Sequence, residues 1–249
     1  MNRRFALLTL VAYSFAGNTA SADFFIPPTP EVGGISTPFR QLARTDINYY
    51  NSSILSSLTQ PTFIQGIQLR LSAAGNGAIP ASWPSQNLSF ANYTIQLSNS
   101  SAAVRAAGEL PTLSSFTSYQ GANTVTVFNG PLTIAANSYA NTGLANPFGT
   151  QIVFTTPFLY IPGDDLEIYI SHTGYVPNSE PQPFFAVGAY APFTRDAASS
   201  TLGANQTSPN GFTNPLVFQL DVVSTPVPAT VFLGLAAMPL ISLLHRKRA

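Results

Sequence analysis

The sequence predicts an all-β protein built as an antiparallel two-sheet sandwich, with the jelly roll as one variant of that topology. Three observations predict this fold. Apolar and polar residues alternate in several segments, and clusters of Gly, Pro, Asn and Asp separate those segments. The region between the two ends also lacks a sustained period of 3.6 residues. Alternation is typical of an antiparallel strand with one face on a core and the other in water.

The alternation also predicts which side chains of each strand face the core. In the strand around Ile168, Glu167 and Tyr169 should lie on the polar, solvent-facing side. Further strands are expected at 40–50, 152–154 and 184–189. The residues predicted to point inward are Ile67, Leu69, Leu71, Tyr93, Ile95, Leu97, Val125, Val127, Leu166, Ile168, Ile170, Phe218, Leu220 and Val222.

The chain between the two ends, residues 23–223, is expected to form a single β-sandwich domain. Its length is that of one large domain, and it contains no clear internal repeat. The segment from Ser101 to Leu110 could form one or two helical turns, which Gly108 and Pro111 would end. Long loops are expected at 73–89 and 191–214, which are rich in Ala, Ser, Asn, Gly and Pro.

Residues 1–22 have the organisation of a secretory signal peptide. A pair of arginines precedes an apolar stretch at 5–17, and Ala20 and Ala22 then form a small-x-small cleavage site. The mature chain should therefore begin at Asp23. The alternative, an N-terminal membrane anchor, would need about 20 apolar residues, and they are absent.

Residues 224–249 consist of a Pro-x-Pro sequence, an uncharged stretch and a basic end. The Pro-x-Pro sequence predicts an extended, accessible segment. The uncharged stretch 231–244 would span only about 21 Å as a helix, short of the roughly 30 Å hydrocarbon core, and a basic end resists crossing a bilayer. The tail is therefore either a transient membrane stop that is processed or an anchor that is never cut. Its key residues are Pro226, Val227, Pro228, Arg246, Lys247 and Arg248.

This tail resembles the PEP-CTERM sorting signal of bacterial exported proteins, although Val227 stands where that family usually has Glu. The resemblance implies passage through the secretion machinery and processing by an exosortase-like membrane peptidase. The body also resembles one that recurs on PEP-CTERM proteins, which implies a β fold and no established activity. The segments that carry this second resemblance are 40–50, 64–70, 95–98, 127–130 and 156–166.

Composition fits a secreted protein with a non-catalytic surface role. Residues 23–225 contain ten acidic and five basic residues, which gives a formal charge of −5 and argues against nucleic acid as a partner. Charged residues make up 8% of the chain, against about 25% in typical soluble domains. Cysteine is absent, so the fold must be stabilised by core burial without disulfides.

The search for catalytic and cofactor motifs gives no strong candidate, and no cofactor is expected. The mature region has one histidine, His172, which is predicted to be an ordinary residue at a strand end or in a loop. A zinc site would need several His or Cys ligands. No GxSxG elbow, Walker loop or dinucleotide fingerprint occurs.

Asp164, Asp165 and Glu167 form the one cluster of acidic residues. The favoured interpretation is a turn at Gly163-Asp164-Asp165 that an Asp side chain closes on the backbone. Weaker alternatives are a calcium site with oxygen ligands from Asp164 and Asp165, and a glycosidase-type pair formed by Asp165 and Glu167.

Aromatic residues are the remaining candidates for binding. Trp83 and several tyrosines could present flat faces to sugar rings, with Tyr169 the best surface candidate, although core packing is favoured for each one singly. Two functions stay open in addition to a plain exported surface protein: a carbohydrate-binding module of the extracellular polysaccharide, and a glycoside hydrolase. A row of exposed aromatic residues on one sheet face would favour the carbohydrate-binding module. Two carboxylates that face each other across a cleft would favour the glycoside hydrolase.

Overall fold

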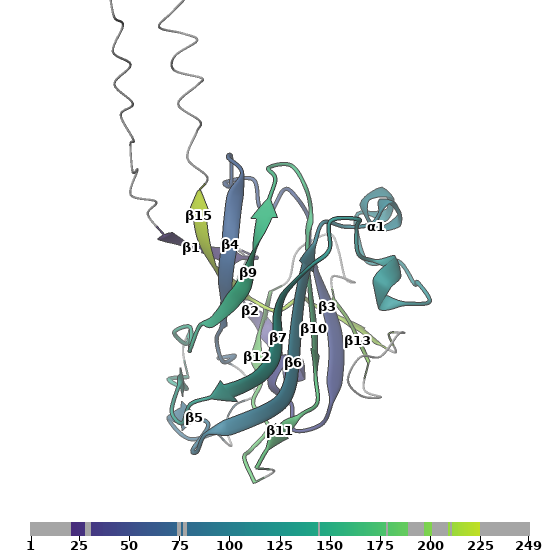
Figure 1. Ribbon diagram of the computed structural model, residues 1–249. Coiled ribbons are helices and arrows are strands. Elements are labelled where there is room, and N and C mark those ends of the chain that lie inside the picture. Colours follow the sequence, from purple (N-terminus) through teal and green to yellow (C-terminus); the bar gives the residue numbers. More distant parts are fainter. Residues whose placement is uncertain are drawn as a thin grey trace, which may run out of the picture. The chain divides into compact units, whose positions relative to one another are not determined.

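The computed structural model confirms the all-β sandwich (Figure 1). It describes residues 21–27, 31–73, 76, 79–143, 145–177, 179–188, 197–200, 209 and 211–224. The stretch Ser21–Thr225 forms one compact unit. Most of the signal-peptide segment and the whole Pro-x-Pro, apolar and basic tail lie outside the described residues.

The first and last strands of the domain are neighbours in a four-stranded antiparallel sheet. β1 forms one edge of this sheet, with Ser21 opposite Val223 and Ile26 opposite Phe218 of β15. The start of the first strand and the end of the last strand therefore lie side by side (Figure 1). In spatial order the strands are β1 (Ser21–Ile26), β15 (Phe218–Ser224), β4 (Thr62–Leu69) and β9 (Ile152–Tyr160).

The second sheet has seven strands among the described residues. Its central strand β10 pairs with β3 on one side and β6 on the other, and β7 pairs with β6. The chain repeatedly crosses between the two sheets, as a sandwich requires. The strands are β11 (Tyr175–Val176), β6 (Leu88–Ser98), β10 (Leu166–His172), β3 (Arg44–Tyr50), β13 (Ala197–Ser200), β14 (Gly211–Thr213) and β7 (Val125–Ile134).

Short elements complete the fold and correct part of the loop prediction. Strand β5 lies within the stretch 73–89, and β13 and β14 lie within 191–214, although both stretches were predicted to be long loops. The short elements are β2 (Glu31–Ile35), which pairs with β12 (Phe185–Gly188); β5 (Ser82–Trp83), which pairs with β8 (Tyr139–Ala140); and the 3₁₀ turns η1 (Thr37–Phe39) and η2 (Phe116–Ser118).

The main core lies between the two sheets and confirms the predicted inward faces. Every predicted inward residue is buried except Val125, which is partly buried and packs against the same core. Burying a large apolar side chain contributes about 1.5–3 kcal/mol relative to leaving it exposed. Core burial is thus the main source of stability in a chain that has no cysteine.

A second, smaller core covers the outer face of β10 and β3, and it overturns the prediction for Tyr169. α1 (Ala102–Ala107) begins at the N-cap Ser101 and ends at Gly108, whose φ is +72°, as predicted. Figure 1 shows α1 beside the larger sheet, away from β15 and β4. Tyr169 is only 9% exposed because it packs in this cluster with Ile47, Tyr49, Val104, Leu110, Phe116 and Tyr119.

Candidate functional site

The predicted turn at Gly163 is confirmed, although the Asp side chain bonds elsewhere. The Asp164 N–H donates to the Ile161 carbonyl at 3.1 Å, and Gly163 has φ of +91°, a conformation that favours glycine. The Asp165 carboxylate instead accepts the Ser52 N–H at 2.8 Å and the Tyr49 hydroxyl at 3.2 Å. Asp165 therefore ties the turn to the loop after β3.

Glu167 lies two residues beyond Asp165 in a buried position on the outer face of β10. Its side chain is fully buried, and its Oε1 atom has no hydrogen-bond partner. Burial raises the pKa of the Glu167 carboxyl well above its ordinary value, and the neighbouring Asp165 raises it further. These two carboxyls lie on one strand end beneath the second core, so they do not form the pair facing across a cleft that a glycosidase needs.

The calcium alternative stays a prediction. Over the ranges that the structure describes, no three His, Cys, Asp or Glu side chains come close enough together to hold a metal ion. Asp165 already accepts two hydrogen bonds from Ser52 and Tyr49.

Among the described residues, the aromatic side chains first considered for sugar binding lie in the core. Trp83 is fully buried, and its Nε1–H donates to the Pro181 carbonyl at 3.1 Å. His172 is at the end of β10, as predicted, and its ring stacks on Tyr93 with centroids 5.5 Å apart. Its Nδ1 accepts the Gly174 N–H at 3.0 Å.

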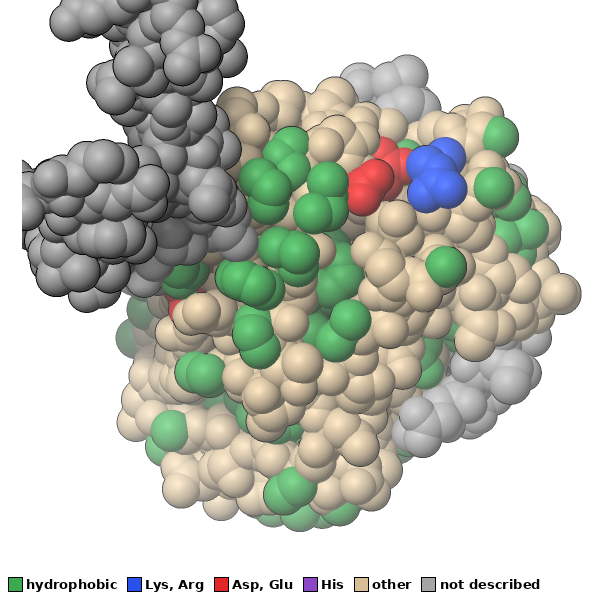
Figure 2. Space-filling view, turned by 45° about the horizontal axis from the view of Figure 1, so that its top comes forward, with side chains coloured by type: hydrophobic (Ala, Val, Ile, Leu, Met, Phe, Trp, Pro, Cys, Tyr) green, Lys and Arg blue, Asp and Glu red, His purple; other side chains and the backbone are tan. Residues whose placement is uncertain are grey.

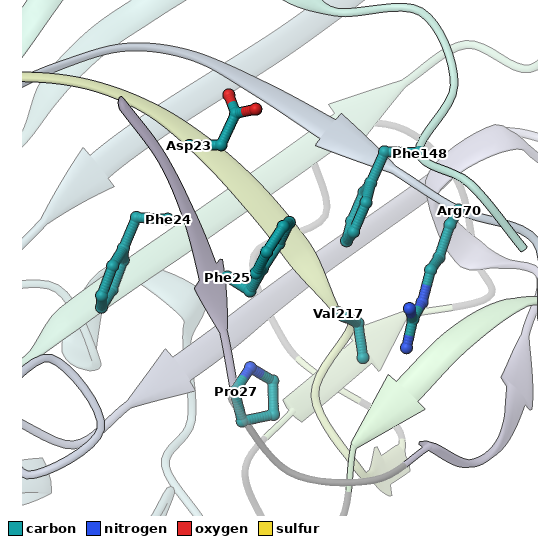
Figure 3. Close-up of a pocket in the computed structure, with 7 residues that line it drawn as sticks. All are labelled: Asp23, Phe24, Phe25, Pro27, Arg70, Phe148 and Val217. Carbon is teal, nitrogen blue, oxygen red and sulfur yellow. The ribbon is translucent and has the colours of Figure 1, made fainter. Parts of the chain in front are cut away.

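The structure instead reveals a hollow over β1, the edge strand of the four-stranded sheet (Figure 3). Its volume is about 410 Å³, within the range of small-ligand sites. Phe25 is 48% exposed there, which is unusual for so large an apolar side chain. The lining residues of this β1 hollow are Asp23, Phe24, Phe25, Pro27, Arg70, Phe148 and Val217.

Two rings and a guanidinium group lie in sequence across the β1 hollow. The rings of Phe25 and Phe148 are stacked, with centroids 5.2 Å apart and planes inclined by 15°. The Arg70 guanidinium carbon lies 5.4 Å from the centre of the Phe148 ring, within cation–π range. Figure 3 shows Phe25 and Phe148 between Asp23 and Arg70.

The backbone next to Phe148 is held in place by contacts that only glycine permits. The Gly149 N–H donates to the Leu69 carbonyl at 2.8 Å. A Cβ on Gly149 would lie 2.3 Å from the Tyr139 ring, closer than real Cβ contacts occur. The amide of Gln151 donates to Asp221 Oδ2 at 2.8 Å, which ties the same segment to β15. The position of the Phe148 ring is therefore set by the fold.

Sequence reasoning missed the β1 hollow because its residues come from distant parts of the chain. Residues 23–27 directly follow the predicted signal peptide and show no clear alternation. Asp23 was singled out as the first mature residue, and it lies exposed in β1. The preceding residue of β1, Ala22, is paired with Val222 of β15, whereas Ala20 lies outside the described residues.

Other exposed apolar side chains accompany Phe25 on the described surface. Val153 and Leu159 of β9 and the adjacent Ile161 are 62%, 40% and 43% exposed. Figure 2 shows hydrophobic side chains spread over one face of the domain, with few charged groups among them.

Among the described residues, no helix has both the length and the apolar character needed to cross a membrane.

In comparisons with known proteins, no family model matches the chain and no curated protein matches its sequence.

Proposed function

We propose that the protein is a non-enzymatic exported protein of a bacterium, sorted to the cell surface or its exopolysaccharide matrix through residues 224–249. The observation that carries this proposal is the pair of export-type segments at the two ends of one β-rich unit. The secretion machinery would act on the first segment. An exosortase-like membrane peptidase would act at Pro226-Val227-Pro228, while the basic end at 246–248 stays on the cytoplasmic side.

The pairing of β1 with β15 supports a defined order of events. Ala22 and Asp23 are opposite Val222 and Asp221, and β15 is the last strand among the described residues. The Ala22–Asp23 bond is therefore free of strand pairing until the whole domain has been exported. Signal cleavage would then precede folding of β1 onto the sheet, and sorting would follow it.

Intact mass and N-terminal sequencing of protein recovered from the cell surface test this proposal. The expected N-terminus is Asp23, and the expected mass lacks both the signal peptide and the segment after the prolines. Surface protein that still begins at Met1 would contradict export through a cleaved signal. Protein found only in the cytoplasm would contradict the whole proposal.

Carbohydrate binding is the second candidate, and the β1 hollow is the observation that favours it. The exposed Phe25 ring, stacked on the partly buried Phe148 ring, suits the apolar C–H faces of sugars. This activity is compatible with the first proposal, because a protein of the surface matrix meets polysaccharide. A glycoside hydrolase would need a second carboxylate across the hollow from Asp23, and its described lining contains no other acid.

A further inference from the structure

We propose that the β1 hollow binds a saccharide unit that carries a carboxylate group, with the sugar ring on Phe25 and the carboxylate on Arg70. This inference rests on the proposed function, because matrix polysaccharide is the ligand that a surface protein would meet. It goes further by naming the chemistry of the ligand and the residues that recognise it.

The aromatic part of the site is available to a ligand. Phe25 is 48% exposed, and its other side is supported by the Phe148 ring at 5.2 Å. The narrow spacing between the rings leaves no room for a sugar between them. A sugar ring would therefore lie on the open side of Phe25, where C–H groups meet the negative face of the aromatic ring.

The site is formed before the ligand arrives. Phe25 belongs to β1, which is hydrogen-bonded along β15, and Phe148 is positioned by Gly149 and Gln151. Neither ring would lose much conformational freedom on binding. Preorganisation of this kind lowers the entropic cost of association.

Arg70 supplies the charge that selects an acidic sugar. Its guanidinium lies next to the Phe148 ring, and its buried Nε has no hydrogen-bond partner. Stacked arginine presents its remaining N–H groups in a planar fork that matches a carboxylate. Charged residues form only 8% of this chain, so an arginine in an aromatic hollow is a distinctive feature.

Asp23 offers hydrogen-bonding groups to the hydroxyls of the sugar. It is exposed on the other side of the two rings from Arg70, as Figure 3 shows. Its carboxylate accepts hydrogen bonds from sugar hydroxyls, and the α-amino group that the proposed cleavage would leave on Asp23 donates hydrogen bonds to them. The ligand that satisfies both ends has one carboxylate at Arg70 and hydroxyl groups at Asp23, which is the pattern of a uronic acid residue.

The test compares acidic polysaccharides with the same polymers after reduction of their carboxyl groups to hydroxymethyl groups. Polygalacturonate and alginate serve as probes, and binding to the full-length chain is measured by affinity electrophoresis at low salt. We expect the acidic forms to bind more tightly, and the difference to shrink in salt because ionic attraction is screened.

Two variants separate the contributions of ring and charge. Phe25→Ala should weaken binding of acidic polymer by at least about tenfold, which corresponds to about 1.4 kcal/mol. Arg70→Gln should abolish the preference for acidic over reduced polymer. Phe184→Ala and Arg40→Gln are the matched controls outside the hollow, and Phe25→Tyr should retain binding. Far-UV circular dichroism of each variant checks that the fold persists.

Absence of binding to both acidic polymers would overturn this inference. Equal binding of acidic and reduced polymers, unchanged by Arg70→Gln, would overturn the assignment of the carboxylate. The cellular location is measured independently of binding. Surface protein that fails to bind would therefore contradict only this inference, and binding protein that stays in the cytoplasm would contradict only the proposed function.

Discussion

At the scale of single residues, the most consequential finding is a carboxyl group in the protein interior. Asp46 of β3 is opposite Ile170 of β10 and is 2% exposed. The Asn48 amide donates to Asp46 Oδ2 at 3.3 Å, while Oδ1 has no hydrogen-bond partner. Burial raises the pKa of Asp46 from 3.8 to about 7, and the Asn48 hydrogen bond opposes this rise. The neutral form is thus the one that the fold prefers.

The pKa of Asp46 predicts that the protein loses stability as the pH rises. The folded state binds this proton more tightly than the unfolded state, so the free energy of unfolding should fall between about pH 4 and pH 7. Asp46→Asn should weaken this dependence, leaving the part that the buried Glu167 carboxyl contributes in the same direction, and should raise the unfolding free energy at pH 8 by an amount on the order of a few kcal/mol. Urea titrations at pH 5 and pH 8 measure it.

Asp164→Asn is the matched control for this prediction, because Asp164 is only half-buried. The control should leave the difference between pH 5 and pH 8 as it is in the unchanged chain. If Asp46→Asn also leaves that difference unchanged, another group is responsible for the pH dependence.

Hydrophobic alternation could not have predicted the position of Asp46. In β3 the apolar residues Ile47 and Tyr49 point to one face, so a two-residue period places Asp46 on the solvent face. In the structure both faces of β3 are covered, and all seven of its residues are buried. The segment of α1 covers the face of Ile47 and Tyr49, so Asp46 lies on the inner face of the sheet, beside its β10 partner Ile170 of the main core. A two-residue period separates the two faces of a strand, but it cannot predict which face lies against the main core.

At the scale of elements, the segment around α1 shows the same limit. The helix and its end at Gly108 were predictable from propensity and capping residues. Its packing on β10 was not, because the contacts between Val104 and Tyr169 join residues far apart in the sequence. The inward faces of the strands were predictable since the main core follows the alternation. The alternation did not predict strand β1, so it did not predict the β1 hollow either.

The packing of α1 on the outer face of β10 and β3 predicts a difference between two substitutions on the same helix. Val104→Asp places an unpaired charge in the cluster that contains Ile47 and Tyr169. It should therefore destabilise the packing of α1 on the sheet by several kcal/mol. Ala103→Asp is the control, because Ala103 is exposed. Hydrogen exchange of the amides of 101–123 should accelerate strongly in the first variant and little in the second. Equal exchange in both would mean that the helix does not depend on this contact.

At the scale of the whole molecule, the pairing of the first and last described strands brings the points where the two proposed targeting segments begin to one end of the sheet. Ser21 is opposite Val223, so the chain enters and leaves the domain at neighbouring positions. The sequence predicted both signals but not this proximity, which depends on the strand order β1-β15-β4-β9. Loss of either signal leaves the main core intact, since its described residues begin at Ile26 and end at Val222.

This independence of core and tail leads to a prediction about the C-terminal segment. Deleting residues 231–249 should release folded protein from the cell, because this segment is the only apolar stretch expected to hold the mature chain in a membrane. Replacing Pro226 and Pro228 with Ala should leave the tail uncut. The variant should then be held in the membrane and be about 2 kDa heavier than the processed form, from the mean residue mass of a 26.4 kDa chain of 249 residues.

Intact mass and fractionation of the same cells measure both results. Pro209→Ala, outside the proposed processing site, is the control and should be processed like the unchanged chain. As a helix, residues 231–244 would be too short for a comfortable permanent span, and the basic end would hold the prolines on the outer side, which is the physical reason to expect cutting. Surface protein that retains Arg248 would instead show that the tail is a plain anchor.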